Sequence, residues 1–194
     1  MTGRFYEITP EIMELANKCS ASSIIPSELY TKYNVNRGLR DLNGKGVLVG
    51  LTHISDVCST KLVNGEYIPA EGELYYRGYN VKDLVKGIAP DSHFGFEECA
   101  YLLMFGELPT KEQLKNFCGL LSEYRTLPTS FVRDIIMKAP SVDLMNTLGR
   151  SVLTLYSYDD RADDITTENV LRQCLQLVAL FPMFAVYGYQ AACY

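Results

Sequence analysis

Hydrophobic residues recur three and four positions apart through most of the chain, which is the spacing of one face of an α-helix. In segment 11–18, Ile12, Met13, Leu15 and Ala16 would share such a face. Further helices are expected at residues 27–33, 81–86, 96–105, 111–124, 128–136, 142–155 and 170–189, joined by short segments that Pro or Gly marks. The pattern therefore predicts a mainly α protein.

Residues that commonly cap helices stand in front of several of these segments. Asn80 is expected to cap the helix at 81–86, and Ser141 and Thr167 are expected to cap the last two helices. Thr110 is followed three residues later by Gln113, which is the pattern of a capping box. These caps fix where four of the predicted helices should begin.

The segment near residues 46–77 interrupts the helices with a small β-hairpin excursion. Asn64-Gly65 lies between two β-prone runs, and this pair favours a tight hairpin turn because both central residues need a positive φ. Short β-type runs are expected at 47–49, 61–63, 66–68 and 73–76.

Charge and composition narrow the class of protein. The net charge of −5 and the lack of a basic run disfavour nucleic acid as a partner. The beginning of the chain has no apolar core of a secretory signal, and the most apolar run, 177–189, is shorter than the ~20 residues of a membrane span. The six cysteines form no C-x-x-C pair, so we expect reduced, structural cysteines. These features predict a soluble cytoplasmic protein that binds no membrane.

Candidate chemical groups are sparse. His53 and His93 have no second ligand at zinc spacing, and each is expected to be a surface or turn residue. Loop 158–164 contains Asp159, Asp160, Asp163 and Asp164, but it lacks the order of an EF-hand, so a solvated acidic loop is expected. The glycine-rich segment 43–50 does not match the phosphate-binding P-loop pattern, and it precedes a strand rather than following one. We predict no metal site and no catalytic residue, and the residues that would bind a cofactor are unknown.

Arg77 is a more open case. It lies among tyrosines in Tyr75-Tyr76-Arg77-Gly78-Tyr79, at an expected strand-to-helix junction. The guanidinium could bind an anion, or it could hold the turn by stacking and hydrogen bonds. The structural role is favoured, because no second candidate group accompanies it in the sequence.

Several stretches, in a shared order and spacing, make the chain resemble the citrate synthase family. Glu73–Val81 with Asp83-Leu84 resembles the family's R-G-Y-x-[IV]-x-x-L signature. Phe94–Leu103 with Phe105–Pro109 resembles its F-E-E-x-x-Y-L-L-x-x-G-x-L-P segment. The other stretches that resemble the family are 37–52, similar to the entry segment of longer bacterial forms; 143–148, similar to an H-P-M-x-x-L helix with Ser141-Val142-Asp143 in place of its lead-in; and 181–189.

The resemblance implies an acyltransferase that condenses acetyl-CoA with oxaloacetate to give citrate and CoA. It implies a mainly helical homodimer, in which residues 1–194 correspond to the amino-terminal part of the large domain. The family's two catalytic histidines and its aspartate lie in segments that have no match here. We therefore expect this chain to be inactive alone and to bind no cofactor, with acetyl-CoA as a co-substrate of the full-length enzyme.

Two other interpretations stay open at this stage. A 2-methylcitrate synthase would use propionyl-CoA in place of acetyl-CoA, and the acyl pocket would lie outside these residues. A non-catalytic domain could instead act through helix association, because the last expected helix is apolar on most faces.

Overall fold

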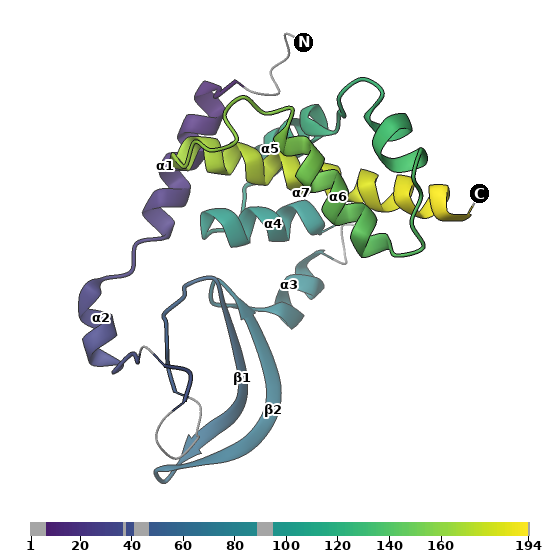
Figure 1. Cartoon of the computed structure of the whole chain (residues 1–194). Coiled ribbons are helices and arrows are strands. Elements are labelled where there is room, and N and C mark those ends of the chain that lie inside the picture. The colour runs from purple at the N-terminus through teal and green to yellow at the C-terminus, as the bar shows by residue number, and fades with distance from the viewer. Residues whose placement is uncertain (1–6, 37, 41–46, 89–94, 194) are drawn as a thin grey trace. The chain divides into compact units, whose positions relative to one another are not determined.

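The computed structural model describes residues 7–36, 38–40, 47–88 and 95–193 of the 194-residue chain. Helices dominate, and the strands form one small antiparallel sheet of order β1-β2-β3 (Figure 1). The elements are α1 (Pro10–Ser22), α2 (Ser27–Lys32), β1 (Ser55–Val63), β2 (Glu66–Tyr76), β3 (Tyr79–Asn80), α3 (Val81–Ile88), α4 (Phe96–Phe105), α5 (Lys111–Tyr124), the π-helix η3 (Val132–Met137), α6 (Leu144–Tyr156) and α7 (Thr167–Cys193). The mainly α fold class with a small β-hairpin excursion is confirmed.

The chain divides into two compact units, and the divisions fall inside α1 and α5. Unit 1 comprises Met1–Asn17 and Lys115–Tyr194, and unit 2 comprises Lys18–Leu114. Each unit has its own buried residues.

Unit 1 is built on α7, which packs against α6 and η3. The aromatic rings of Phe131 and Phe184 stack with centroids 5.9 Å apart. Gly188 of α7 lets α6 approach closely, because a Cβ at this position would lie 3.0 Å from Cγ2 of Thr147. The core cluster consists of Phe131, Ile136, Leu155, Leu180 and Phe184.

Unit 2 combines the hairpin with α3 and α4. Its buried side chains come from the two helices, and the rings of Tyr101 and Phe105 pack edge to face at 4.6 Å. From residue 17 to residue 83, none of the described residues is buried. The hairpin therefore has little core of its own.

Local signals in the sequence located several boundaries correctly. Asn64 and Gly65 have φ of 52° and 85°, and they form the two-residue turn between β1 and β2. Asn80 Oδ1 accepts a hydrogen bond from the Lys82 amide at 2.9 Å, as its predicted capping role requires. The capping box of Thr110 and Gln113 is complete, with reciprocal bonds of 3.2 and 2.8 Å.

Other expectations about the elements were wrong. Residues 47–49 form no strand, and the expected third strand at 73–76 is the continuation of β2. The segment expected as an α-helix at 128–136 contains η3 instead. Asp143, not Ser141, caps α6, since its carboxylate accepts bonds from the amides of Met145 and Asn146. The last helix begins at Thr167 itself, so Thr167 is its first residue and not its cap.

Helix α7 is long and apolar enough to cross a membrane by length and composition alone. The same properties are expected of a core helix, and α7 packs in unit 1 through buried residues that include Leu175 and Leu180. It continues through Pro182, which lies inside the helix. This packing favours the core-helix interpretation, while the absence of membrane binding stays a prediction.

Candidate functional site

Arg77 lies in a two-residue turn of unit 2, where Tyr76 of β2 pairs with Tyr79 of β3. Arg77 and Gly78 have φ of 48° and 86°, so the turn has the same pattern of positive φ as Asn64-Gly65. Gly tolerates this backbone, whereas Arg adopts it at an energetic cost. A side chain held in such a place needs contacts that compensate for the strain.

The contacts of Arg77 are with the ends of two helices. Its Nε and Nη2 donate to the carbonyl oxygen of Leu103 in the last turn of α4, at 3.0 and 2.8 Å. Its Nη1 donates to the carbonyl oxygen of Ser22 at the end of α1, at 3.2 Å. Carbonyl groups at a helix C-terminus lack partners within the helix and carry partial negative charge. The guanidinium therefore joins the carboxyl ends of α1 and α4 to the β2–β3 turn.

These contacts support the structural role for Arg77 over the anion-binding one. Three of its nitrogens already donate to backbone oxygens, and a Cβ at Gly106 would lie 3.0 Å from Cβ of Ser22 and 3.9 Å from Cζ of Arg77. The close packing leaves little room on that side of the guanidinium.

An open cavity of about 330 Å³ lies beside the same turn. It is lined by Thr52, His53, Ser55, Asp56, Tyr75, Arg77 and Gly78. Asp56 accepts from the thiol of Cys58 at 3.2 Å, and Tyr75 donates to Glu73 at 2.9 Å. Acidic groups thus accompany the basic ones, so the cavity has no excess of positive charge that would select an anion. His53 is exposed at its rim.

Lys18 forms a second polar contact in unit 2. Its Nζ donates to the hydroxyl of Tyr101 at 2.8 Å, lies 5.0 Å from that ring's centroid, and pairs with the carboxylate of Glu107. Partial burial favours the neutral amine, but the bonds to Glu107 and Tyr101 outweigh this effect and raise the pKa of Lys18. The ammonium group fastens the end of α1 to α4 and to the residue that follows its C-cap glycine.

Among the described residues, Arg172 in unit 1 carries a fully buried charge. The sequence analysis did not predict it. The Arg172 side chain of α7 is 0% exposed, and its Nη2 donates to Asp159 Oδ2 at 2.6 Å, where the carboxylate side chain is 9% exposed. Arg172 also donates to Asn169 Oδ1 at 3.0 and 2.9 Å and to Gln176 Oε1 at 3.3 Å. Such a network satisfies the buried guanidinium.

This network corrects the expectation of a wholly solvated acidic loop. Burial would raise the pKa of Asp159, but hydrogen bonds from Arg172 and Gln173 hold it below its usual range. Asn169 Nδ2 donates to the carbonyls of Arg161 and Asp164, both at 2.8 Å, so α7 holds the loop at several points. The sequence carried one signal: Asn169, Arg172 and Gln176 lie at i, i+3 and i+7, which places three polar residues on one face of a mainly apolar helix.

Two further carboxylates of the loop, those of Asp163 and Asp164, accept hydrogen bonds from nearby residues. The amide of Thr166 and the guanidinium of Arg161 donate to Asp164, and together they lower the pKa of that carboxyl to about 2. Tyr156 donates to the carboxylate of Asp163 at 2.9 Å. Among the described residues, no group of three or more His, Cys, Asp or Glu is placed to hold a metal ion.

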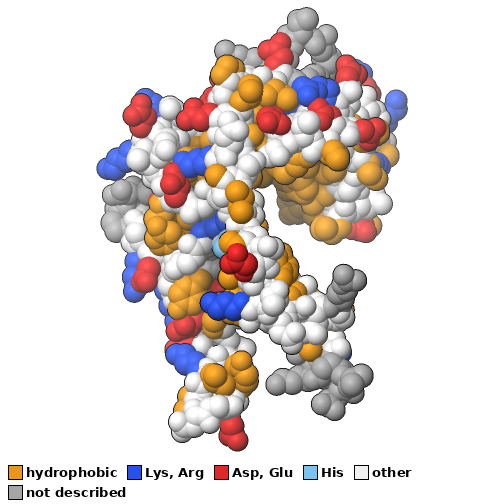
Figure 2. All heavy atoms as spheres, turned by 90° about the vertical axis from the view of Figure 1, so that its left-hand side faces the viewer, with side chains coloured by type: hydrophobic (Ala, Val, Ile, Leu, Met, Phe, Trp, Pro, Cys, Tyr) orange, Lys and Arg blue, Asp and Glu red, His pale blue; other side chains and the backbone are white. Residues whose placement is uncertain are grey.

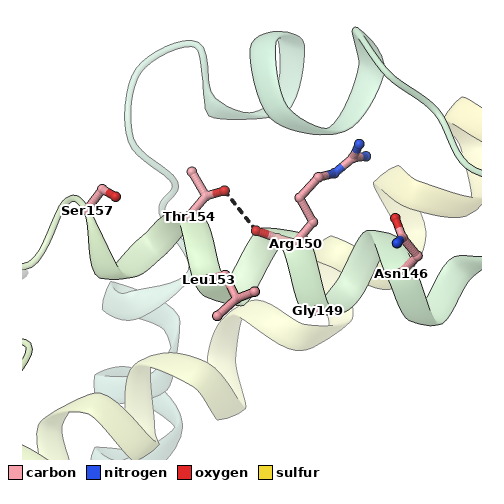
Figure 3. Close-up of a pocket in the computed structure, with 6 residues that line it drawn as sticks. All are labelled: Asn146, Gly149, Arg150, Leu153, Thr154 and Ser157. Atoms are coloured by element: carbon pink, nitrogen blue, oxygen red, sulfur yellow. Dashed lines mark hydrogen bonds between the residues drawn. The ribbon is translucent and has the colours of Figure 1, made fainter.

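An open pocket of about 540 Å³ follows one face of α6 (Figure 3). Its lining residues, Asn146, Gly149, Arg150, Leu153, Thr154 and Ser157, recur at the three- and four-residue spacing of a single helix face. Arg150 Nη2 donates to the carbonyl of Ala139 at 2.7 Å, and Thr154 donates to the carbonyl of Arg150. No atom lies within 4 Å of a Cβ at Gly149, so the face is open at its middle.

The distribution of charged side chains on the surface agrees with the lack of a basic run in the sequence. On the face drawn in Figure 2, Lys and Arg side chains are interspersed with Asp and Glu rather than gathered in one patch. His93 and residues 43–46 of the glycine-rich segment 43–50 lie outside the described residues, so their expected roles stay predictions.

Comparisons with known proteins point in one direction. A family model described as "Citrate synthase, C-terminal domain" matches residues 39–193. The chain is 35% identical over 134 residues to 2-methylcitrate synthase 1 of Corynebacterium glutamicum, covering 66% of this chain and 32% of that protein. It is 33% identical over 100 residues to citrate synthase of Saccharolobus solfataricus, covering 51% of this chain and 25% of the relative.

A solved structure agrees with the sequence relatives. The crystal structure of citrate synthase from Pyrobaculum aerophilum matches with a TM-score of 0.59 at 26% identity, over 79% of this chain and 38% of that one. The chain thus spans about a third of the length of curated relatives such as the Corynebacterium protein. Because the family model matches well over half of the residues, and the fold agrees, this chain belongs to the citrate synthase family.

Proposed function

We propose that the protein containing these residues is a citrate synthase, which condenses acetyl-CoA with oxaloacetate to release citrate and CoA. The observation that carries the proposal is the family match over residues 39–193. Citrate synthases among the relatives and the agreement of the fold with a citrate synthase structure support it. This reaction is the entry step of the tricarboxylic acid cycle.

Within that enzyme, we assign residues 1–194 to the amino-terminal part of the large domain, with a scaffolding role. Arg77 joins helix ends in unit 2, and Arg172 fixes the α6–α7 connection in unit 1, so the buried or half-buried arginines have structural partners. We therefore propose that the catalytic acid and base are supplied by other parts of the protein. Acetyl-CoA would be a co-substrate, and we assign no cofactor or metal to this chain.

The test has two arms. The reading frame should first be followed downstream of codon 194, and the product of the complete frame should be assayed for CoA release from acetyl-CoA with oxaloacetate. We expect saturable turnover from that product and none from the 194-residue chain. A complete product that folds but releases no CoA from any acyl-CoA with oxaloacetate would refute the proposal.

A second candidate, 2-methylcitrate synthase, is favoured by the 35% identity to a protein of that name. Citrate synthases at 31–33% identity lie too close to separate the two activities. The ratio of kcat/KM for acetyl-CoA and propionyl-CoA decides between them. A ratio above one supports citrate synthase, and a ratio below one supports the alternative.

We also propose a homodimer, with α6 and α7 contributing to the interface. The open face of α6 has Gly149 at its middle, and a small residue there allows a second helix to approach closely. Met145, Leu153 and Tyr156 of α6 are exposed, as is Val186 of α7. Such apolar exposure on neighbouring helices is typical of an interface.

Leu153→Lys tests this interface, because Leu153 is 76% exposed and contributes little to the folded monomer. We expect the variant to weaken dimerisation at least tenfold in sedimentation velocity, since a charge would be buried at the contact. Lys115→Ala, on an exposed position of α5, is the matched control. Equal dimerisation of both variants would contradict this placement of the interface.

The alternative of a non-catalytic association domain makes a different prediction. It requires a stop codon directly after residue 194 and association of the chain without any acyl transfer. We propose cytoplasmic localisation together with the enzymatic function, because α7 packs in unit 1 through buried apolar residues such as Leu175 and Leu180. Recovery of the chain in the membrane fraction would contradict that localisation.

A further inference from the structure

Strand β1 lies at an edge of the described sheet, because the strand order is β1-β2-β3. Beyond the two residues of β3, the ribbon consists of β1 and β2 only. Figure 1 shows these two strands as a long curved ribbon. A two-stranded ribbon alone is marginally stable in water, and this one carries exposed Val57, Leu62 and Tyr67. One side of β1 is therefore available to another strand, within the part of the chain that is described.

Natural proteins protect such edges with short strands, prolines, bulges or several charges. β1 has nine residues, no proline and two charged residues, Asp56 and Lys61. The irregularity in the ribbon adds residues to β2 rather than to β1, since Cys58 pairs with Glu73 while Thr60 pairs with Pro69. The outer edge of β1 is thus long and continuous, which suits it to strand pairing.

The sequence of β1 is complementary to itself. In an antiparallel pair, residues directly opposite each other point to the same face of the sheet. If a two-fold axis relates the two strands, it must therefore pass between a residue and the same residue of the second copy. With the axis at Thr60, Val57 of one copy faces Val63 of the other. Cys58 then faces Leu62, and Thr60 faces its own copy. Apolar and Thr–Thr pairs of this kind stabilise antiparallel sheets.

The neighbouring symmetric register is poorer. With the axis at Ser59, Val57 would face Lys61 and Leu62 would face Asp56. Val57 and Leu62 would then each lie opposite a charge, and Val63 would face the polar Ser55. The pattern of β1 therefore selects one register among its closest alternatives.

We propose that β1 pairs with β1 of a second copy of this chain, antiparallel and centred on Thr60, to form a continuous sheet across two molecules. This contact uses unit 2 and is separate from the α6–α7 interface proposed above, so it requires neither that interface nor the enzymatic activity. With both contacts present, the protein assembles beyond a dimer.

The test uses the whole chain and three substitutions at the exposed Thr60. Thr60→Lys and Thr60→Glu each place two like charges opposite one another, and Thr60→Val is the uncharged control with high β-propensity. All chains in this test also carry Leu153→Lys, which weakens the α6–α7 contact proposed above. Sedimentation velocity over a concentration series should show association of the chain with Thr60 and of Thr60→Val. Each charged variant should associate about fivefold more weakly.

Mixing the two charged variants provides a readout that a folding defect would not give. A copy carrying Thr60→Lys then faces a copy carrying Thr60→Glu, so opposite charges meet across the axis. The mixture should regain association at the level of the chain with Thr60 or above, although each variant alone is weakened. Thermal unfolding of each variant at low concentration checks that the monomers fold alike. If Thr60→Lys associates as the chain with Thr60 does, or if the mixture is no tighter than its components, the proposed pairing is wrong.

Discussion

Arg172 shows how much one buried side chain can determine. Its guanidinium is fully buried on α7, and Asp159 is the carboxylate that pairs with it. Removing one partner of a buried ion pair leaves the other charge without compensation, which typically costs about 3–5 kcal/mol. The pair is thus a specific requirement of unit 1.

We predict that Asp159→Asn lowers the free energy of unfolding by roughly 3 kcal/mol, because the buried pair with Arg172 loses the charge of its Asp159 carboxylate. Urea unfolding followed by circular dichroism measures this change. Asp160→Asn, on the neighbouring residue, is the control and should change stability by less than ~0.5 kcal/mol. Equal effects of the two substitutions would contradict the assigned role of Asp159.

A second carboxylate of the loop, Asp164, should make the stability of the chain depend on pH in the acid range. The folded pKa of Asp164 is about 2, below its ordinary value of 3.8. A lowered pKa contributes stability that is fully present above the unfolded value and is lost as the pH falls through the folded value. We therefore expect this contribution to disappear between about pH 4 and pH 2. In Asp164→Asn, the pH dependence of the melting temperature should be flatter in that window, and an unchanged profile would contradict the shift.

At position 77, the conformation of the turn and the contacts with two helices favour different residues. Asn is favoured where φ is positive, so Arg77→Asn should improve the local turn. It would also remove the charge-assisted bonds to Leu103 and Ser22, which are worth about 1.5–3 kcal/mol each. We expect a net loss of roughly 2 kcal/mol in urea unfolding. A stabilised variant would show that the turn, not the helix contacts, determines this position.

At the scale of the elements, close helix packing depends on where glycine lies. Gly119 of α5 has open space around a Cβ, whereas Gly188 of α7 faces Thr147 of α6 at 3.0 Å. Gly119→Ala should therefore stabilise the chain by about 0.5–1 kcal/mol through helix propensity.

Gly188→Leu should instead destabilise the chain by about 1–3 kcal/mol, because the larger side chain must displace α6. Thermal unfolding of both variants compares an open position with a packed one. If both glycines tolerated substitution equally, the close approach of α6 and α7 would be contradicted.

Local signals account for the elements that the sequence predicted well. Asn80, Thr110 and the Asn64-Gly65 turn act on neighbouring backbone groups. A short stretch of sequence therefore contains the residues that determine these caps and this turn. The error at Ser141 arose because Asp143, two residues on, offers a stronger acceptor to the same helix. The π-helix η3 depends on packing against α6 and α7, which no local pattern records.

The candidate sites were less predictable for a related reason. Arg172 and Asp159 are 13 residues apart and meet only because α6 and α7 fold back on each other. Arg77 reaches Ser22 across 55 residues and Leu103 across 26. The lack of a second candidate group in the sequence favoured a structural role for Arg77, but it did not indicate which helix ends Arg77 contacts.

At the scale of the whole molecule, family membership has to be related to the part of the family's length that this chain covers. The chain spans about a third of relatives such as the Corynebacterium 2-methylcitrate synthase, and its polar groups with the best-defined partners serve the fold. Our account is that these residues form a scaffold of a citrate synthase, while the reacting groups are contributed by other parts of the protein.

The most direct test of this account is an assay of CoA release, in which the folded 194-residue chain is compared with the product of the complete reading frame. Acetyl-CoA and oxaloacetate are supplied to both, and free thiol is measured over time. We predict release by the complete product and only the uncatalysed background from the 194-residue chain. Enzyme-like release by the 194-residue chain alone would contradict the account.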